Sequence, residues 1–230
     1  MSTFLITGSN RGIGLELARQ TAARGDHVIA TCRDPAAATQ LQALAAAHPL
    51  NAGVLALDVA DPASIAAARA SIGTRKIDVL INNAGIIGPA RQSTLDMDFD
   101  GFALTLMVNT LAPLRIAQAF LANLREGAGG KIATITSGMG SMSYAKSDRI
   151  AYRAAKAAVN KVMQGLASDV KPLGVAVLLL HPGWVRTDMG GAGASISASD
   201  SAAGILEQID ALTLARSGMF LDHVGKTMPW

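Results

Sequence analysis

The stretch "TFLITGSNRGIGLELARQ", residues 3–20, joins a short apolar run to three closely spaced glycines and the start of a helix. Residues 3–7 predict a strand, and the glycines at positions 8, 12 and 14 predict a tight turn into a helix that ends at Gly25. A strand, a glycine turn and a helix N-terminus together bind the pyrophosphate of a dinucleotide. The spacing G-x-x-x-G-x-G differs from the standard fingerprint, so this stretch alone also fits an ordinary strand–helix turn.

The rest of the chain repeats this alternation of strand and helix. Further strands are predicted at 27–32, 53–59, 77–83, 131–137, 174–181 and 218–222, and helices at 35–47, 62–72, 98–124 (with a kink near Pro113), 149–170 and 198–215. The strands are continuously apolar, which is typical of a parallel sheet covered on both faces. The sequence therefore predicts one α/β domain over residues 1–230, a doubly wound parallel Rossmann sheet of about seven strands with helices on both faces.

Composition narrows the classes of function. Hydrophobic residues make up 50% of the 230 and charged residues 16%, which fits a chain with a sizeable core. The 20 Lys and Arg residues are scattered, so we expect no nucleic-acid partner. The apolar runs are too short for a membrane span or a signal peptide, and the lone Cys32 allows no internal disulfide. The four histidines lack metal-ligand spacing. We therefore expect a cytoplasmic protein without a metal or a membrane partner.

Four motifs lie in register along the whole chain: "TGSNRGIG" (7–14), "NNAG" (82–85), "YRAAK" (152–156) and "PGWVRTDM" (182–189). In this order they resemble the short-chain dehydrogenase/reductase family in its classical form. The C-terminal "FLDHVGKTMPW" and the compact length are further similar to the C-factor/sniffer-like carbonyl reductases of that family. The resemblance implies a nicotinamide dinucleotide bound at the carboxyl ends of the strands.

The residues that follow the second strand indicate which dinucleotide is bound. Cys32 stands where NAD-using members of the family usually carry an acidic residue, and Arg33 follows it. Arg33 and Arg11 together would bind the 2′-phosphate of NADP, although both also fit solvated surface charge. We interpret Asp34 as the N-cap of the next helix, with Pro35 in its first turn. The sequence therefore favours NADP(H) over NAD(H).

The resemblance assigns a larger set of residues to the cofactor. Asp58 and Val59 would border the adenine, and the segments after the fourth and sixth strands would line the rest of the cofactor. The expected cofactor-binding residues are Gly8, Ser9, Asn10, Arg11, Gly12, Ile13, Gly14, Arg33, Asp58, Val59, Asn82, Ala84, Gly85, Tyr152, Lys156, Pro182, Gly183, Val185 and Thr187.

Tyr152 and Lys156 share one face of a predicted helix, one turn apart. A nearby ammonium lowers the pKa of a tyrosine, which suits a general acid–base near neutral pH. Ser137 ends a predicted strand and its hydroxyl can donate to or accept from a substrate oxygen. The resemblance makes Asn109, Ser137, Tyr152 and Lys156 a catalytic tetrad, in which Asn109 holds a water that relays protons to Lys156. Taken singly, each also fits a structural role, such as a turn or a local hydrogen bond.

These observations predict an NADPH-dependent reductase that converts an aldehyde or ketone to an alcohol by hydride transfer. The family resemblance also suggests a homodimer or homotetramer that associates through helices 98–124 and 149–170. The alternative is a C-factor-like signalling or developmental protein that binds NAD(P) with little or no turnover. The Gly/Ala/Ser-rich segment 190–204 is either a lid over the site or a plain surface loop. Apolar side chains at Ile86, Ile87, Met139, Tyr144, Trp184 and Met189 would form the walls of a moderately hydrophobic substrate pocket.

Overall fold

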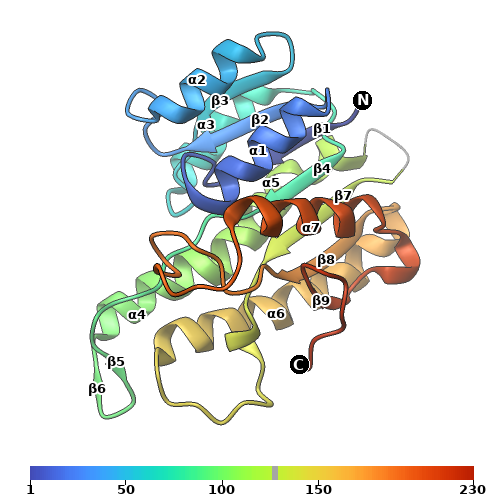
Figure 1. Cartoon of the computed structure of the whole chain (residues 1–230). Helices are drawn as coiled ribbons and strands as arrows, with labels where there is room; N and C mark the ends of the chain where they lie inside the picture. The colour runs from blue at the N-terminus through green and yellow to red at the C-terminus, as the bar shows by residue number, and fades with distance from the viewer. Residues whose placement is uncertain (126–128) are drawn as a thin grey trace.

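A seven-stranded sheet lies at the centre of the computed structural model, which describes residues 1–125 and 129–230 (Figure 1). Its strands are β1 (Thr3–Ile6), β2 (His27–Cys32), β3 (Ala52–Ala56), β4 (Val79–Asn82), β7 (Lys131–Ile135), β8 (Ala176–His181) and β9 (Phe220–Asp222). They run in the order β3-β2-β1-β4-β7-β8-β9, and every neighbouring pair is parallel. The order reverses between β1 and β4, where open α/β sheets bind their ligands. The predicted doubly wound parallel sheet is confirmed.

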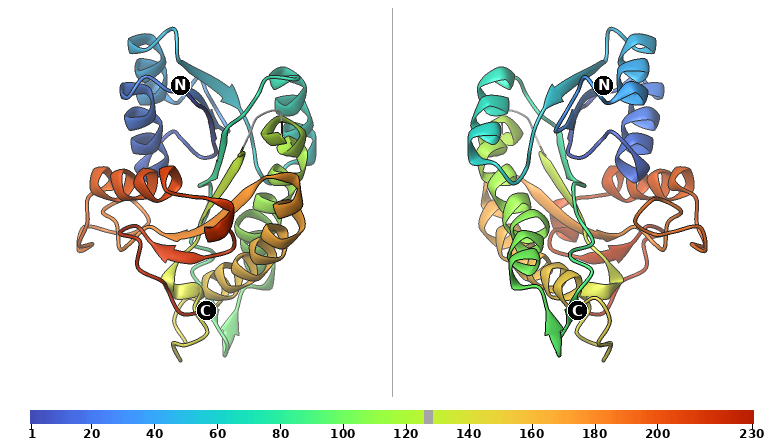
Figure 2. Two further views of the ribbon diagram at one scale, coloured as in Figure 1. Left: turned by 90° about the vertical axis from the view of Figure 1, so that its right-hand side faces the viewer. Right: turned by 90° about the vertical axis from the view of Figure 1, so that its left-hand side faces the viewer.

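Helices cover both faces of the sheet, as Figure 2 shows edge-on. One face carries α1 (Gly12–Ala23), α2 (Thr39–Ala47) and α7 (Ala198–Asp210), and the other carries α3 (Pro62–Ile72), α5 (Ala112–Arg125) and α6 (Ile150–Val170). The neighbouring residues Leu5 and Ile6 of β1 are both fully buried, Ile6 in the core with Leu17 of α1 and Leu5 in the core with Phe120 of α5. Successive side chains of a strand point to opposite faces, which explains why the strands are continuously apolar.

The helix expected over 35–47 begins later, at Thr39. Asp34 does act as a cap, because its Oδ1 accepts hydrogen bonds from the backbone N–H groups of Ala36 (3.0 Å) and Ala37 (3.2 Å). These bonds close a turn over residues 35–37 rather than the first turn of α2. An aspartate followed by proline is favoured at a turn as well as at a helix N-terminus, so the sequence alone does not separate the two.

The helix expected over 98–124 is divided into three parts. These are α4 (Phe99–Leu106), a π-helical turn over Met107–Leu111, and α5. Pro113 has no N–H to donate to the carbonyl of Asn109, so a regular α-helix cannot continue through this point. The expected kink therefore takes the form of a π-turn just before the proline, and Asn109 lies within it.

The same stretch, Phe99–Arg125, has the length and the mean hydropathy (1.3) of a membrane-crossing helix, and half of its apolar window is buried inside the protein. Phe120 and Leu124 are fully buried in the core on this face of the sheet. The apolar residues of the buried half of this stretch thus belong to the core, whereas Leu104 and Leu111 are exposed.

Two further features differ from the expected elements. The helix expected over 198–215 ends at Asp210, and a 3₁₀ turn follows over Leu214–Arg216. A small antiparallel hairpin, β5 (Gln92–Ser93) and β6 (Asp96–Met97), lies between β4 and α4 and was not predicted. Each strand of this hairpin has only two residues, which is too short for a periodic pattern in the sequence.

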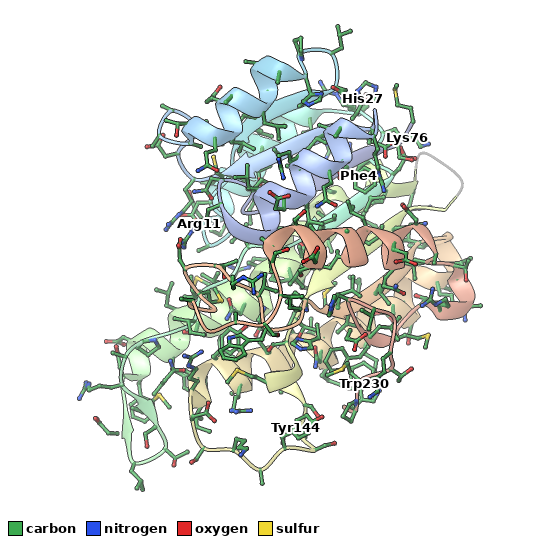
Figure 3. The ribbon with its side chains drawn as sticks, viewed as in Figure 1. Phe4, Arg11, His27, Lys76, Tyr144 and Trp230 are labelled. Carbon is green, nitrogen blue, oxygen red and sulfur yellow. The ribbon has the colours of Figure 1, made fainter. Side chains whose placement is uncertain are left out.

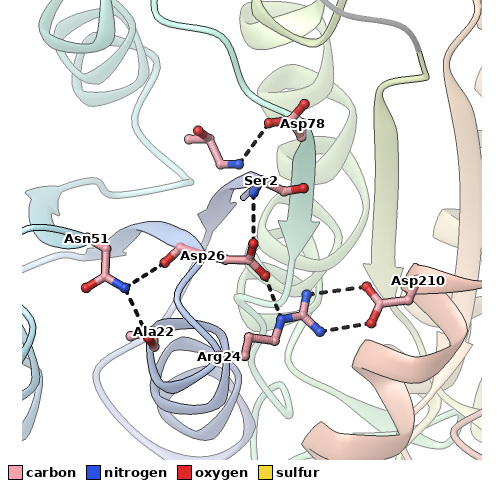
Figure 4. Close-up of polar contacts among 8 residues, drawn as sticks. Ser2, Ala22, Arg24, Asp26, Asn51, Asp78 and Asp210 are labelled. Atoms are coloured by element: carbon pink, nitrogen blue, oxygen red, sulfur yellow. Dashed lines mark hydrogen bonds and ion pairs between the residues drawn. The ribbon is translucent and has the colours of Figure 1, made fainter.

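A polar network joins the ends of several elements at the amino edge of the sheet (Figure 4). Asp26 accepts a hydrogen bond from the Ser2 N–H (2.8 Å) and pairs with the Arg24 guanidinium (2.7 Å). Arg24 also binds both carboxylate oxygens of Asp210, at the end of α7. This network fixes the edge opposite the strand ends at which the predicted site residues lie.

Candidate active site

The glycine loop at the end of β1 has no room for side chains. A Cβ on Gly8, whose φ is +66°, would lie 2.9 Å from the Ala84 Cα, and a Cβ on Gly14 would lie 2.2 Å from the Gly8 carbonyl oxygen. Helix α1 begins at Gly12, and its N-cap residue, Arg11, makes no side-chain capping bond. The first N–H groups of α1 are therefore free to bind an anion, and the positive end of the helix dipole favours one. This loop fits the pyrophosphate of a dinucleotide.

Asn83, which was not among the predicted site residues, holds the glycine loop against the end of β4. Its Nδ2 donates to the carbonyls of Thr7 (2.9 Å) and Gly8 (3.0 Å). In return, the Thr7 hydroxyl accepts from the backbone N–H groups of Asn83 and Ala84, each at 3.0 Å. The predicted neighbours Ala84 and Gly8 are thus brought together by a residue that the motif "NNAG" contains but does not single out.

Asn82 was expected to line the cofactor, and its side chain instead faces the core. Its Nδ2 donates to the Pro113 carbonyl (3.2 Å) and to the Thr134 hydroxyl (3.4 Å), and the residue is buried. Asn82 is the last residue of β4, so it and Asn83 lie on different sides of the strand end. The Asn82 Oδ1 is buried without a hydrogen-bond partner among the described residues, and the expected contact of Asn82 with the cofactor stays a prediction.

Ser9 is also turned inward, away from a ligand. Its N–H donates to the Thr31 carbonyl (2.8 Å) and its hydroxyl to the Ile6 carbonyl (2.9 Å). The bond to Thr31 places the glycine loop beside the end of β2, two residues before Arg33. Arg33 is exposed, and within residues 1–125 and 129–230 it forms no ion pair. Its position and free charge suit the 2′-phosphate of NADP.

Arg11 and the neighbouring Asn10 and Ile13 lie at the start of α1, and Asn10 and Arg11 are exposed. Figure 3 shows Arg11 above the loop that leads into α7. Its guanidinium pairs with Asp188 of that loop at 2.5 Å. The Asp188 carboxylate competes for this cation, and the expected contact of Arg11 with the 2′-phosphate stays a prediction.

The predicted segment from Pro182 to Thr187 lies across the glycine loop, where the Thr187 Cγ2 would be 3.3 Å from a Cβ on Gly12. The Pro182 carbonyl accepts from the Ser201 hydroxyl (2.7 Å), and buried Val185 forms a β-bridge with Ile196. Gly183 has a φ of +85° and leaves no space for a Cβ beside Ile196. The segment is thus held rigidly at the carboxyl edge of the sheet.

The expected lid over residues 190–204 is only partly a loop. Residues 198–204 belong to α7, and the preceding residues are tied down by the Trp184 indole, which donates to the Gly190 carbonyl (2.9 Å), and by Arg186, which donates to the Ala194 carbonyl (3.0 Å). The abundance of Gly, Ala and Ser in this segment suggested that it is flexible. Its backbone is instead fixed by hydrogen bonds from side chains outside the segment, which its own composition does not reveal.

Asp58 and Val59 follow β3 at the same edge and are partly buried. The Asp58 Oδ1 accepts from the Ala60 N–H (2.9 Å), and the Asp58 N–H is bound by the Ser64 hydroxyl (2.9 Å). Their place beside β2 is compatible with the expected contact to an adenine.

Ser137, Tyr152 and Lys156 meet at the ends of β7 and α6, and all three are buried. The Ser137 hydroxyl accepts from the Met139 N–H (3.1 Å) and lies near enough to the Tyr152 hydroxyl to lower its pKa, and the Lys156 ammonium lies 5.7 Å from the centre of the Tyr152 ring. Lys156 donates to the Ile135 carbonyl at 2.9 Å. A Cβ on Gly85 would lie 3.8 Å from the Lys156 Nζ, so the backbone after β4 closes the group on another side.

Burial has a strong effect on the titration of these groups. It raises the pKa of Tyr152, and the Ser137 hydroxyl and the charge of Arg149 lower it by less. Burial also lowers the pKa of Lys156 to about 8. The Tyr152 pKa is thus raised rather than lowered, because desolvation of the phenolate outweighs the charge of Arg149, and the lowering expected from Lys156 is not seen.

Asn109 is bound to the catalytic region through its side chain rather than open to it. Its Oδ1 accepts from the Ile86 N–H (2.9 Å) and its Nδ2 donates to the Ile86 carbonyl (2.8 Å). With both side-chain groups occupied, the expected water would bind the backbone carbonyl of Asn109. That carbonyl is the one to which Pro113 cannot donate.

Gln92 of β5 is a second site residue that the sequence did not indicate. Its Oε1 accepts from the backbone N–H of Tyr152 (3.1 Å), and its Nε2 donates to the carbonyls of Ile87 (3.2 Å) and Pro89 (2.8 Å). The N-cap residue of α6, Arg149, provides no side-chain cap, so Gln92 serves this purpose from 60 residues away. It joins the segment after β4 to the catalytic helix.

The expected pocket walls are only partly gathered. Ile86, Ile87 and Met139 are partly buried near the tetrad, whereas Tyr144, Trp184 and Met189 are 50%, 58% and 40% exposed. Figure 3 shows Tyr144 on the loop before α6, away from α1. Within the part of the chain that the structure describes, no group of three or more His, Cys, Asp or Glu side chains is arranged to hold a metal ion.

Comparisons with known proteins agree with this geometry. A model of the short chain dehydrogenase family matches residues 2–195. The C-signal protein of Myxococcus xanthus is 44% identical over 162 residues, which cover 70% of this chain and 96% of that protein. The structure of the NADPH-bound carbonyl reductase from chicken fatty liver is similar with a TM-score of 0.94 and 36% identity, over 100% of this chain and 99% of that one. The carbonyl reductase Sniffer of D. melanogaster is similar with a TM-score of 0.91 and 31% identity over 100% of both chains.

Proposed function

Because the chain belongs to the short-chain dehydrogenase family, we propose that it is an NADP-dependent oxidoreductase that reduces an aldehyde or ketone to an alcohol. The observation that carries the proposal is the contact of Ser137, Tyr152 and Lys156 beside a glycine loop that opens a helix. The similar structures include an NADPH-bound carbonyl reductase, which supports both the reaction and the cofactor.

The chain's own residues fit NADPH along the carboxyl edge of the sheet. The free N–H groups of α1 suit the pyrophosphate, and Arg33 suits the 2′-phosphate, with Cys32 rather than an acidic residue before it. Gly85 and the segment from Pro182 to Thr187 border the tetrad and would hold the nicotinamide end. When bound, NADPH supplies the hydride for the carbonyl carbon.

Ser137 and Tyr152 would bind the substrate carbonyl oxygen through their hydroxyls and so polarise the carbonyl. Tyr152 then transfers its proton to that oxygen as the alcohol forms. Its raised pKa keeps it protonated at neutral pH, as a donor must be. Lys156, whose pKa of about 8 lies near neutrality, returns a proton to the tyrosine, with the Asn109 carbonyl holding a relaying water.

The decisive experiment measures NADPH oxidation by the purified protein with a panel of aldehydes, ketones and quinones. Turnover that is lost in Tyr152→Phe, with the Kd for NADPH within about threefold of wild type, supports the proposed roles. An equal loss of NADPH binding and turnover would contradict the role of Tyr152 as proton donor.

The similarity to C-signal favours a second candidate, an NAD(P)-binding signalling protein with little or no turnover. The same panel separates the two functions. Tight NADPH binding without turnover of any carbonyl compound would favour signalling, whereas turnover favours the enzyme. The complete tetrad is the observation that makes the enzyme our preferred function.

We also propose that the chain forms a single domain, and a homodimer or homotetramer that associates through α6 and through the exposed side of α4 and α5. Leu104 and Leu111 are 50% and 43% exposed and lie on one stripe of this helical stretch with Met107 and Leu114. A second copy of the chain would cover this stripe. Light scattering of Leu111→Glu tests the proposed interface, because a charge at the interface should yield a monomer.

We propose a cytoplasmic location on the basis of the single cysteine.

A further inference from the structure

An open surface cavity of about 660 Å³ lies between the segment that follows β4 and the loop that precedes α6. Ile87, Gly88 and Gln92 contribute to one wall, and Ser147 and Arg149 to the other. The β5–β6 hairpin, which carries Gln92, and the loop before α6 both project beyond the same end of the molecule (Figure 1). The volume lies within the range of small-molecule pockets.

Each wall of this cavity leads directly into a catalytic residue. The first wall continues from Ile86, whose backbone is bound on both sides by Asn109, and Gln92 on it accepts from the Tyr152 N–H. The second wall ends at Arg149, three residues before Tyr152 in the chain. A molecule in the cavity therefore touches the segments that position the tetrad.

Two arginines, Arg91 and Arg149, and two aspartates, Asp96 and Asp148, line the cavity. Asp96 pairs with Arg91 (3.2 Å) and Asp148 pairs with Arg153 (2.7 Å), so both carboxylates in the lining are neutralised. Arg149 is exposed and forms no ion pair with any residue in 1–125 or 129–230. Arg149 is thus the arginine of the lining without a direct carboxylate contact, although its charge helps to lower the pKa of Asp148.

The backbone of Arg149 also marks this position. Its φ of 53° and ψ of 48° are left-handed, and it is the one non-glycine residue with positive φ among those that the structure describes. Such conformations are uncommon for residues other than glycine, asparagine and aspartate, and they cluster at ligand sites. Arg149, the N-cap residue of α6, thus has a strained backbone conformation and a side chain without an ion pair among the described residues.

We propose that this cavity binds the part of the substrate remote from the reacting carbonyl, and that Arg149 pairs with a carboxylate on that part. The inference rests on the proposed function and gives it a substrate class, carbonyl compounds that carry a carboxylate. The planar guanidinium can bind a carboxylate through two parallel hydrogen bonds. Ile87 and Gly88 provide an uncharged wall for the chain between the two groups.

Arg149 also acts on Tyr152 at a distance, since its charge lowers the pKa of that tyrosine. This effect applies equally to neutral and anionic substrates. A comparison of each acid with its methyl ester therefore isolates the proposed carboxylate contact, because any loss shared by the two cancels in their ratio.

The test measures kcat/KM for ω-oxo carboxylates of increasing chain length, each beside its methyl ester. Arg149→Asn removes the charge and tolerates the left-handed backbone, and Arg149→Lys keeps the charge. For the acid of best-fitting length, we expect the acid-to-ester ratio to fall about tenfold in Arg149→Asn and to be partly restored in Arg149→Lys. Arg75→Asn, at the opposite edge of the sheet, is the matched control and should leave the ratio unchanged. A ratio that Arg149→Asn leaves unchanged at every length overturns the inference.

A binding measurement separates this inference from the proposed reaction. Titration calorimetry measures the Kd of the ω-hydroxy carboxylate for the protein in the presence of saturating NADP⁺. If the protein binds the ω-hydroxy carboxylate and Arg149→Asn abolishes this binding, the carboxylate site is supported. If no carbonyl compound is reduced in that case, only the proposed reaction is overturned. Reduction of the esters without Arg149-dependent binding of the acid overturns the carboxylate site and leaves the reaction intact.

Discussion

The Lys156 ammonium donates a hydrogen bond to the backbone carbonyl of Ile135 at 2.9 Å, and the residue is only 5% exposed. A single carbonyl replaces little of the hydration of an ammonium, and burial lowers the Lys156 pKa to about 8. The protein thus keeps at its catalytic centre a cation that folding disfavours.

This burial predicts a pH-dependent cost of Lys156 to stability. Below pH 8 the lysine is charged in both states and the folded protein bears the full penalty, whereas between about pH 8 and 10.5 the penalty fades because the folded state releases its proton first. We expect Lys156→Met to be about 2–3 kcal/mol more stable than wild type at pH 7 and to lose most of this advantage by pH 10. Urea unfolding at both pH values, without cofactor, measures the difference.

Lys161→Met, an exposed position further along the same helix, serves as the control and should show no such pH dependence. A stability gain of Lys156→Met that is equal at both pH values would indicate better apolar packing rather than relief of a buried charge.

The ion pair between Arg11 and Asp188 leads to a prediction about cofactor affinity. The two side chains are 65% and 76% exposed, so the pair contributes at most about 1 kcal/mol. Asp188→Asn should release Arg11 for the 2′-phosphate and lower the Kd for NADPH about two- to fivefold. The Kd for NADH, which lacks this phosphate, should change little. Fluorescence titration with both cofactors measures the effect.

The double variant Arg11→Ala/Asp188→Asn is the control for this prediction. If Asp188 acts by competing for Arg11, the gain in NADPH affinity disappears when Arg11 is absent. A gain that persists in the double variant would show that Asp188 instead repels the phosphate directly.

Gln92 is predicted to hold the catalytic helix in position. Gln92→Leu leaves the Tyr152 N–H and the carbonyls of Ile87 and Pro89 without their partner, which should lower the free energy of unfolding by about 1–3 kcal/mol. We expect kcat to fall more than the affinity for NADPH, because the displaced group is the proton donor. Ser93 is the next residue of β5 and is exposed, so Ser93→Ala should change neither the free energy of unfolding nor kcat appreciably. Unchanged kcat in a folded Gln92→Leu protein would contradict the positioning role.

The fold was predictable because each strand is a run of apolar residues. Both faces of the sheet are covered, as at Leu5 and Ile6, so the strands lack the alternation of apolar and polar residues that an exposed strand shows. The tetrad stays a prediction, which the sequence supports because its members belong to local motifs that resemble a known family. The same motifs did not separate Asn82 from Asn83, because the direction of a side chain at a strand end depends on where the strand stops.

The features that the sequence did not indicate are those made by distant partners. Gln92 reaches Tyr152 across 60 residues, and Arg11 reaches Asp188 across 177. No spacing along the chain reports such contacts, since they depend on which strand ends meet at the carboxyl edge. The pKa of Tyr152 likewise follows from its burial, whereas the sequence shows only the lysine one turn away.

Gly14 is predicted to be the glycine at which a methyl group is least tolerated in the cofactor loop. A Cβ there would lie 2.2 Å from the Gly8 carbonyl oxygen and 2.4 Å from the Asn83 Nδ2, so Gly14→Ala must push the loop away from the end of β4. We expect at least about a tenfold loss of NADPH affinity and a lower melting temperature. Gly165→Ala adds the same methyl group within α6, where nothing lies within 4 Å of it, and should stabilise the protein by up to about 1 kcal/mol. If Gly14→Ala bound NADPH as tightly as Gly165→Ala, the close approach of the loop to β4 would not be what forms the pyrophosphate site.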